Sequence, residues 1–104
     1  MSEEVQDWIK QTIAQHPVVI FMKGTASFPQ CGFSGKAIKV LKECGATNMA
    51  TVNVLESEAI REGIKQFSNW PTLPQVYIKG EFIGGSDIVA DMAASGELQK
   101  MLAD

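Results

Sequence analysis

Residues 18–34 read VVIFMKGTASFPQCGFS, a short apolar run followed by a loop and then by a helical pattern. Five consecutive apolar residues, most of them β-branched or aromatic, are typical of a strand buried on both faces, which places residues 18–22 inside a sheet. A loop is expected over residues 24–30. The helix predicted next ends at Gly45, and its inner face carries Phe33, Ala37, Val40, Leu41 and Cys44.

A helix is predicted before this stretch, and a strand and another helix are predicted after it. The first helix ends before Pro17, with Ser2 as a candidate N-cap and apolar residues at helical spacing: Val5, Trp8, Ile9 and Ile13. Residues 50–54 predict a second strand. Ser57 then caps a third helix, whose inner face carries Ile60, Ile64 and Phe67.

The last third of the chain predicts a β-hairpin and two helices. Residues 75–78 and 81–83 form the strands, and Lys79-Gly80 forms the turn. Ser86-Asp87 is a cap-like pair that opens a helix through Met92, before a short tail helix. This order predicts an α/β fold with a four-stranded mixed sheet flanked by helices on both faces, in a single domain over residues 1–104.

Composition excludes several classes of protein. The chain has 104 residues, with 9 Lys and Arg against 12 Asp and Glu, so its formal net charge is −3. A generally basic nucleic-acid binder is therefore not expected. The longest apolar run is far shorter than the roughly 20 residues that cross a bilayer, so no membrane span is expected. With two cysteines and an acidic N-terminus unlike a secretory signal, we expect a cytoplasmic protein.

Cys31 is the main candidate for chemistry. It is expected at a helix N-terminus, where free N–H groups and the helix dipole favour a thiolate and lower the pKa of the thiol. Lys23 adds positive charge nearby in the sequence. Position alone leaves open an ordinary helix-start cysteine, so other residues must decide. Cys44 falls on the inner face of the same helix and is expected to pack in the core.

Four motifs occur in order along the chain: Lys23-Gly24, Cys31-Gly-Phe-Ser34, Trp70-Pro-Thr-Leu-Pro-Gln75 and Gly84-Gly-Ser-Asp87. Together they closely resemble the monothiol glutaredoxins of CGFS type, from residue 18 to residue 102. The resemblance implies a thioredoxin-like fold, in agreement with the element order. It also implies glutathione as a ligand and Cys31 as the reactive thiolate.

The resemblance further implies a glutathione site. Lys23 and Lys65 match lysines that contact glutathione carboxylates, and point charges suit a tripeptide with two carboxylates. Thr72 and Leu73 match residues whose backbone pairs with the cysteinyl portion of glutathione like an added strand. Pro74 matches the cis-proline of the family. The site that holds the γ-glutamyl end in the family is matched by Gly85, Ser86 and Asp87, at a helix N-terminus where a carboxylate is favoured.

Two serines limit redox chemistry at Cys31. Ser34 replaces the second cysteine of a dithiol motif, and Ser86 stands where many family members carry a cysteine. No thiol of this chain at those positions can resolve a mixed disulfide at Cys31. A 2Fe–2S cluster needs about four ligands, and two chains with two glutathiones would supply them.

The resemblance accordingly implies a cluster-bridged homodimer, with Cys31 as the one protein ligand from each chain. Such a protein passes clusters to acceptor proteins, often with BolA-like partners. One alternative is a weak glutathione-dependent disulfide oxidoreductase that uses Cys31. Another is an adaptor that docks a BolA-like protein through a basic helix face of Lys36, Lys39 and Lys42.

Overall fold

The structure is a computed structural model and describes residues 3–103. All the predicted helices and strands are present, and one short 3-10 turn, η1, is added. Ser2 lies outside the described residues. The elements in chain order are α1 (Glu3–Gln15), β1 (Val18–Met22), α2 (Gly32–Glu43), β2 (Met49–Asn53), η1 (Val54–Glu56), α3 (Glu58–Ser68), β3 (Gln75–Ile78), β4 (Glu81–Gly84), α4 (Ser86–Ser95) and α5 (Glu97–Ala103).

The sheet has four strands in the order β2-β1-β3-β4. Strand β1 is parallel to β2 and antiparallel to β3, and the β3–β4 hairpin is antiparallel. The sheet is therefore mixed, as predicted. All five residues of β1 are buried, because β1 has a strand on each side and helices over both of its faces.

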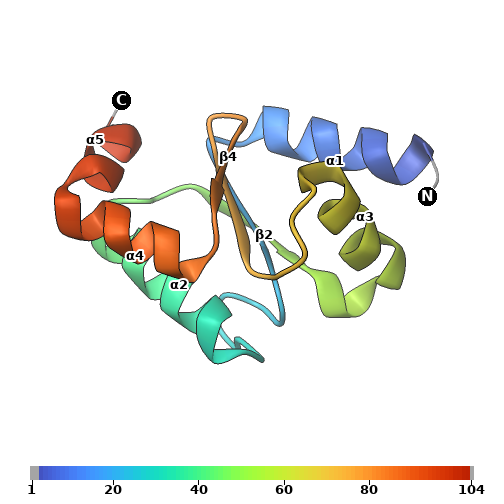
Figure 1. The fold of residues 1–104 in the computed structure, drawn as a ribbon, viewed down its shortest axis with the longest axis horizontal. Helices are drawn as coiled ribbons and strands as arrows, with labels where there is room; N and C mark the ends of the chain where they lie inside the picture. The colour runs from blue at the N-terminus through green and yellow to red at the C-terminus, as the bar shows by residue number, and fades with distance from the viewer. Residues whose placement is uncertain (1–2, 104) are drawn as a thin grey trace.

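Helices cover the sheet in two groups (Figure 1): α1 and α3 lie on one side, and α2, α4 and α5 lie on the other. Side chains alternate along β1, so Val19 and Phe21 face the first group while Ile20 and Met22 face the second. Each face thus has its own apolar core. The loop to α2 begins at the C-terminal end of β1.

Phe33 is not on the inner face of α2, contrary to the prediction. The buried stripe of this helix is Ser34, Ala37, Ile38 and Leu41. A helix turns about 100° per residue, so Phe33, one residue before Ser34, points well away from that stripe and is 60% exposed. Trp8 is displaced in the same way from buried Ile9 and is 43% exposed.

Three predicted boundaries also differ. Helix α4 runs to Ser95 instead of Met92, and Gly96, with a positive φ, ends it. The second strand begins at Met49 and ends at Asn53 instead of running over 50–54, because the Asn53 side chain accepts a hydrogen bond from the Leu55 N–H and turns the chain into η1. Gly84 belongs to β4, and Gly85 is the N-cap of α4. Ser86 and Asp87 are therefore the first residues of that helix and not its caps.

Candidate functional site

Cys31 is the N-cap residue of α2, as the sequence predicted. Its backbone is extended, with φ −145° and ψ 134°, and its carbonyl accepts the Gly35 N–H at 3.0 Å. The side chain is half-buried, and no side-chain capping bond is made. The sulfur therefore sits beside the unpaired N–H groups of the first helical turn.

The surroundings of Cys31 lower the pKa of its thiol. The main cause is the backbone N–H of Ser34 in the first turn of α2, which favours the thiolate over the thiol. Partial burial opposes it. The Phe33 N–H, the positive charge of Lys23 and the Ser34 hydroxyl act in the same direction as the main cause. The helix N-terminus thus acts on this cysteine as predicted.

The loop before Cys31 is held by hydrogen bonds at both of its ends. The Gln30 N–H donates to the Lys23 carbonyl at 2.9 Å, and an isolated β-bridge joins Gly24 to Pro29. The Gly24 N–H donates to Asn53 Oδ1 at 2.9 Å, at the end of β2. Since the loop folds back on itself, it returns the chain to the end of β1 and presents Cys31 there.

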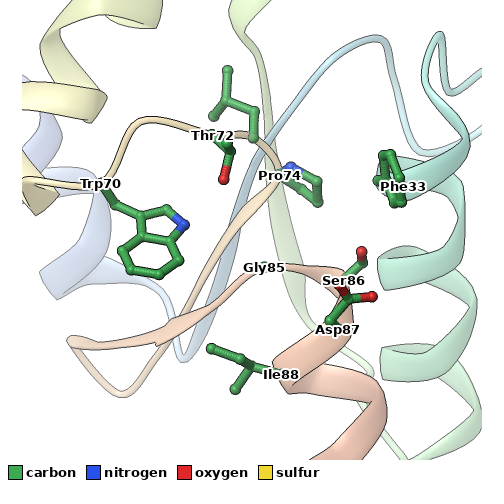
Figure 2. Close-up of a pocket in the computed structure, with 9 residues that line it drawn as sticks. Phe33, Trp70, Thr72, Pro74, Gly85, Ser86, Asp87 and Ile88 are labelled. Atoms are coloured by element: carbon green, nitrogen blue, oxygen red, sulfur yellow. The ribbon is translucent and has the colours of Figure 1, made fainter.

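A groove of about 310 Å³ reaches the first turn of α2 at Phe33, two residues after Cys31. Figure 2 shows Trp70 and Phe33 at its two ends, with Thr72 and Pro74 along one side and Gly85 along the other. The walls come from the first turn of α2, the 70–74 segment and the start of α4. Its nine lining residues are Phe33, Trp70, Thr72, Leu73, Pro74, Gly85, Ser86, Asp87 and Ile88.

The 70–74 segment offers an open backbone edge. The Leu73–Pro74 peptide bond is cis, as the resemblance implied. Within residues 3–103, the N–H and carbonyl of Leu73 make no hydrogen bond. Across the groove, a Cβ atom on Gly85 would lie 3.3 Å from the Pro74 carbonyl oxygen, so glycine lets the two backbones approach. An extended peptide can pair with such an edge.

The predicted residues thus divide between the groove and its surroundings. Six of them line the groove: Thr72, Leu73, Pro74, Gly85, Ser86 and Asp87. Cys31, Lys23 and Lys65 are not among the lining residues. The Lys65 ammonium lies 3.5 Å from Glu62 Oε2 on its own helix, and the Asp87 carboxylate lies 3.7 Å from Lys36 Nζ. The second contact links the basic face of α2 to the groove.

Phe33 and Ile88 line the groove but are not assigned to the site by the sequence, which leaves Trp70 open between packing and shaping the groove. Helical spacing places Phe33 in the core, and Ile88 has the apolar character of any helix residue. Trp70 both packs in the fold and forms the groove: its ring lies 6.0 Å from the Phe82 ring and also lines the groove. Phe33 and Ile88 are 60% and 40% exposed. This exposure distinguishes them from core residues, but the sequence does not reveal it.

The described residues give little support for a second reactive cysteine or for a metal site made of protein side chains alone. Cys44 is the half-buried C-cap of α2 and packs against the core on that side, as predicted. Among residues 3–103, no three His, Cys, Asp or Glu side chains are grouped to hold a metal ion. None of the helices described is long and apolar enough to cross a membrane.

Comparison with known proteins places this chain in a family. The glutaredoxin family model matches residues 18–83. The chain is 49% identical to monothiol glutaredoxin-5, mitochondrial, of Schizosaccharomyces pombe, an alignment that covers all of this chain and 73% of that protein. It is 48% identical to an uncharacterized monothiol glutaredoxin of Synechocystis, over 98% of this chain and 94% of that one.

Solved structures agree. The reduced apo form of poplar GrxS14 is 46% identical, with a TM-score of 0.82 over 95% of this chain and 90% of that one. A buckwheat glutaredoxin–glutathione complex is 27% identical, with a TM-score of 0.85 over 99% of this chain and 94% of that one. The thioredoxin-like fold is thereby confirmed. The chain belongs to the glutaredoxin family, among its monothiol members.

Proposed function

We propose that the groove binds glutathione and that Cys31 is the protein ligand of a 2Fe–2S cluster, which the protein carries as cargo and passes to acceptor proteins. The observation that carries this proposal is a cysteine with a lowered pKa beside a peptide-sized groove that has no second thiol. Cys44, the other cysteine of the chain, lies at the opposite end of α2.

Glutathione fits the groove by its chemistry. The free N–H and carbonyl of Leu73 match the backbone of its cysteinyl residue, which would bring the glutathione sulfur toward Cys31. The start of α4 at Gly85, with its free N–H groups, suits the γ-glutamyl carboxylate. The exposed Asp87 carboxylate suits the α-amino group at the same end. Lys23 and Lys65 are the cations for the glutathione carboxylates.

The ligand count requires more than one chain. A 2Fe–2S cluster takes four ligands, and one chain with one glutathione supplies two thiolates. A dimer with two glutathiones completes the set, so the cluster itself would join the two chains. Two exposed aromatic side chains flank Cys31 in the sequence: Phe28 is 75% exposed and Phe33 is 60% exposed. A second chain could contact both rings at this end of the molecule.

Acceptor proteins and a BolA-like protein are the proposed partners. The basic face of α2 is the candidate docking surface for an acidic partner, because Lys36, Lys39 and Lys42 all reach solvent. This face begins next to Asp87 at the groove, through the contact with Lys36. The cytoplasmic location expected from the N-terminal sequence stays a prediction, which cell fractionation with an antibody against the protein would test.

The lowered pKa of Cys31 also favours a second function, reduction of glutathione mixed disulfides. The Cys31 thiolate would attack the glutathione sulfur, releasing the target thiolate and leaving glutathione disulfide-bonded to Cys31. A second glutathione thiolate would then attack that glutathione sulfur, forming oxidised glutathione and regenerating the Cys31 thiolate. Because Ser34 and Ser86 supply no resolving thiol, this external step should make turnover slow.

Anaerobic cluster reconstitution with and without glutathione tests the main proposal. With glutathione the protein should turn brown and sediment as a dimer, while the apo-protein sediments largely as a monomer. Removing glutathione by gel filtration should bleach the cluster and return the monomer. A brown monomer, or a cluster that forms equally well without glutathione, would contradict the proposal. A turnover rate equal to that of dithiol glutaredoxins would favour the oxidoreductase instead.

A further inference from the structure

Beneath the groove lies a buried polar side chain that the proposed chemistry does not use. Gln75, the first residue of β3, has no exposed surface. Its amide nitrogen donates to the Trp70 carbonyl at 3.1 Å and to the Thr72 carbonyl at 3.3 Å. Both acceptors belong to the segment that lines the groove. One side chain thus holds the 70–74 segment through hydrogen bonds to two of its carbonyls.

The Gln75 amide is itself held in place. The Tyr77 hydroxyl donates to Gln75 Oε1 at 3.1 Å, within a cage of the Phe21, Phe67 and Phe82 rings. Burial raises the pKa of Tyr77 to about 12, so the hydroxyl keeps its proton at neutral pH. With its oxygen occupied by this donor, the amide presents its NH₂ group to the two carbonyls.

We infer that Gln75 is a positioning residue for ligand binding: it holds the Trp70 and Thr72 carbonyls inward, which leaves the Leu73 N–H and carbonyl as the open edge for an extended peptide. The inference rests on the proposed binding of glutathione. A buried glutamine costs free energy unless its amide is fully paired, and here each polar atom of the amide has a partner. An apolar side chain would fill the same space without fixing either carbonyl.

The test measures the affinity for S-methylglutathione, which has the glutathione backbone but can neither bind iron through a thiolate nor form a disulfide. In Gln75→Met, a chain of similar length loses both donors, and we expect Kd to rise about fivefold or more. In Tyr77→Phe the rings stay and only the hydroxyl is lost. We expect a smaller rise there, about twofold to threefold, and this variant decides the question if Gln75→Met does not fold.

Val76→Ala is the matched control. Val76 is equally buried on β3, but its side chain belongs to the core on the other face of the sheet. This variant should lower Tm while its Kd stays within about twofold of wild type, since its side chain makes no hydrogen bond to the 70–74 segment and packs in the core on the other face of the sheet. In Gln75→Met the pH midpoint for alkylation of Cys31 should also be unchanged, because the network does not contact the sulfur.

The outcomes separate this inference from the proposed function. If the wild-type protein does not bind S-methylglutathione, the assignment of the groove to glutathione is wrong. If wild type binds and Gln75→Met and Tyr77→Phe bind equally well, only the positioning role is wrong. If Val76→Ala weakens binding as much as Gln75→Met does, affinity follows general stability, and the positioning role is again contradicted.

Discussion

The Lys23 backbone N–H donates a hydrogen bond of 3.2 Å to the Oγ of Ser34, a residue with no exposed surface. This contact ties the end of β1 to the first turn of α2. The same hydroxyl also helps to lower the pKa of the Cys31 thiol. Ser34 therefore links the sheet to the reactive cysteine in addition to replacing a second thiol.

Replacing Ser34 by alanine should raise the pKa of Cys31, because the hydroxyl no longer favours the thiolate while the backbone N–H groups of Phe33 and Ser34 remain. Iodoacetamide reacts with the thiolate, so the alkylation rate reports the ionisation of Cys31. The midpoint of the rate against pH should therefore lie at a higher pH in Ser34→Ala than in wild type. The free energy of unfolding should drop by about 1–3 kcal/mol, since the Lys23 N–H loses its acceptor.

The control for that experiment is Ser95→Ala, whose hydroxyl donates to the Met92 carbonyl at the C-terminal end of α4, whereas the groove residues of that helix lie at its start. It should leave the alkylation profile of Cys31 unchanged. Identical profiles for Ser34→Ala and wild type would show that the Ser34 hydroxyl does not act on the thiolate.

The loop before Cys31 should tolerate no side chain at Gly24. This glycine has φ +95°, and a Cβ atom would lie 2.5 Å from the Gln30 nitrogen and 2.6 Å from the Phe28 carbonyl oxygen. Gly24→Ala should therefore lower the free energy of unfolding by about 1–3 kcal/mol or more, measured by urea denaturation. Gly32→Ala is the matched control.

Gly32 lies in the first turn of α2 without a positive φ, and a Cβ atom added there would meet no heavy atom within 4 Å. Alanine at this position should be neutral or stabilising by up to about 1 kcal/mol, as helix propensity predicts. Equal stability of the two variants would mean that the loop does not hold the conformation described.

The single tyrosine of the chain should titrate only at very high pH. Burial raises the pKa of Tyr77 to about 12, from an ordinary value near 10. Because the folded state holds this proton more tightly than the unfolded state, stability should be constant in this respect below pH 10 and decrease between about pH 10 and 12. Ultraviolet absorbance of tyrosinate measures the ionisation of Tyr77. Circular dichroism at the same pH values measures the loss of folded structure.

Ionisation of Tyr77 near pH 10 with the fold intact would contradict its burial in the aromatic cage. Tyr77→Phe provides the baseline, since it removes the absorbance change altogether and leaves unfolding by the remaining groups.

Lys65 should contribute to glutathione affinity through its charge. Lys65→Ala should raise Kd several-fold, corresponding to about 1 kcal/mol for a partly exposed charge pair, and added salt should reduce the difference by screening. Lys23→Ala and Asp87→Ala should act similarly. Lys100→Ala, on α5 and away from the groove, should bind like wild type. If Lys23→Ala, Lys65→Ala and Asp87→Ala also bind like wild type, the charge assignments are wrong.

Much of the fold could be predicted from the sequence because local signals and the overall arrangement agree. The apolar run of β1, the Ser57 cap of α3, confirmed by its bond to the Ile60 N–H, and the turn at Lys79-Gly80 each fix an element by local chemistry. The exposure of Phe33 could not be predicted. An apolar residue at the mouth of a groove has the same helical spacing as a core residue, and only the position of neighbouring elements distinguishes the two.

The site was predictable only where a motif carried it. The residues of the Thr72–Pro74 and Gly85–Asp87 motifs line one groove, although the whole β3–β4 hairpin lies between them in the sequence. Gln75 gave no signal of its role, because a glutamine at the start of a strand is ordinarily exposed. Its function depends on the return of the 70–74 segment over β3, which is a property of the tertiary structure.

The central claim is that Cys31 is the only protein ligand of the cluster, and cluster yield in two single-cysteine variants tests it most directly. Anaerobic reconstitution with glutathione should give about one 2Fe–2S cluster per two chains in wild type and in Cys44→Ser, and none in Cys31→Ser. Circular dichroism before reconstitution would establish that both variants are folded. Equal cluster content in Cys31→Ser and wild type would contradict the account.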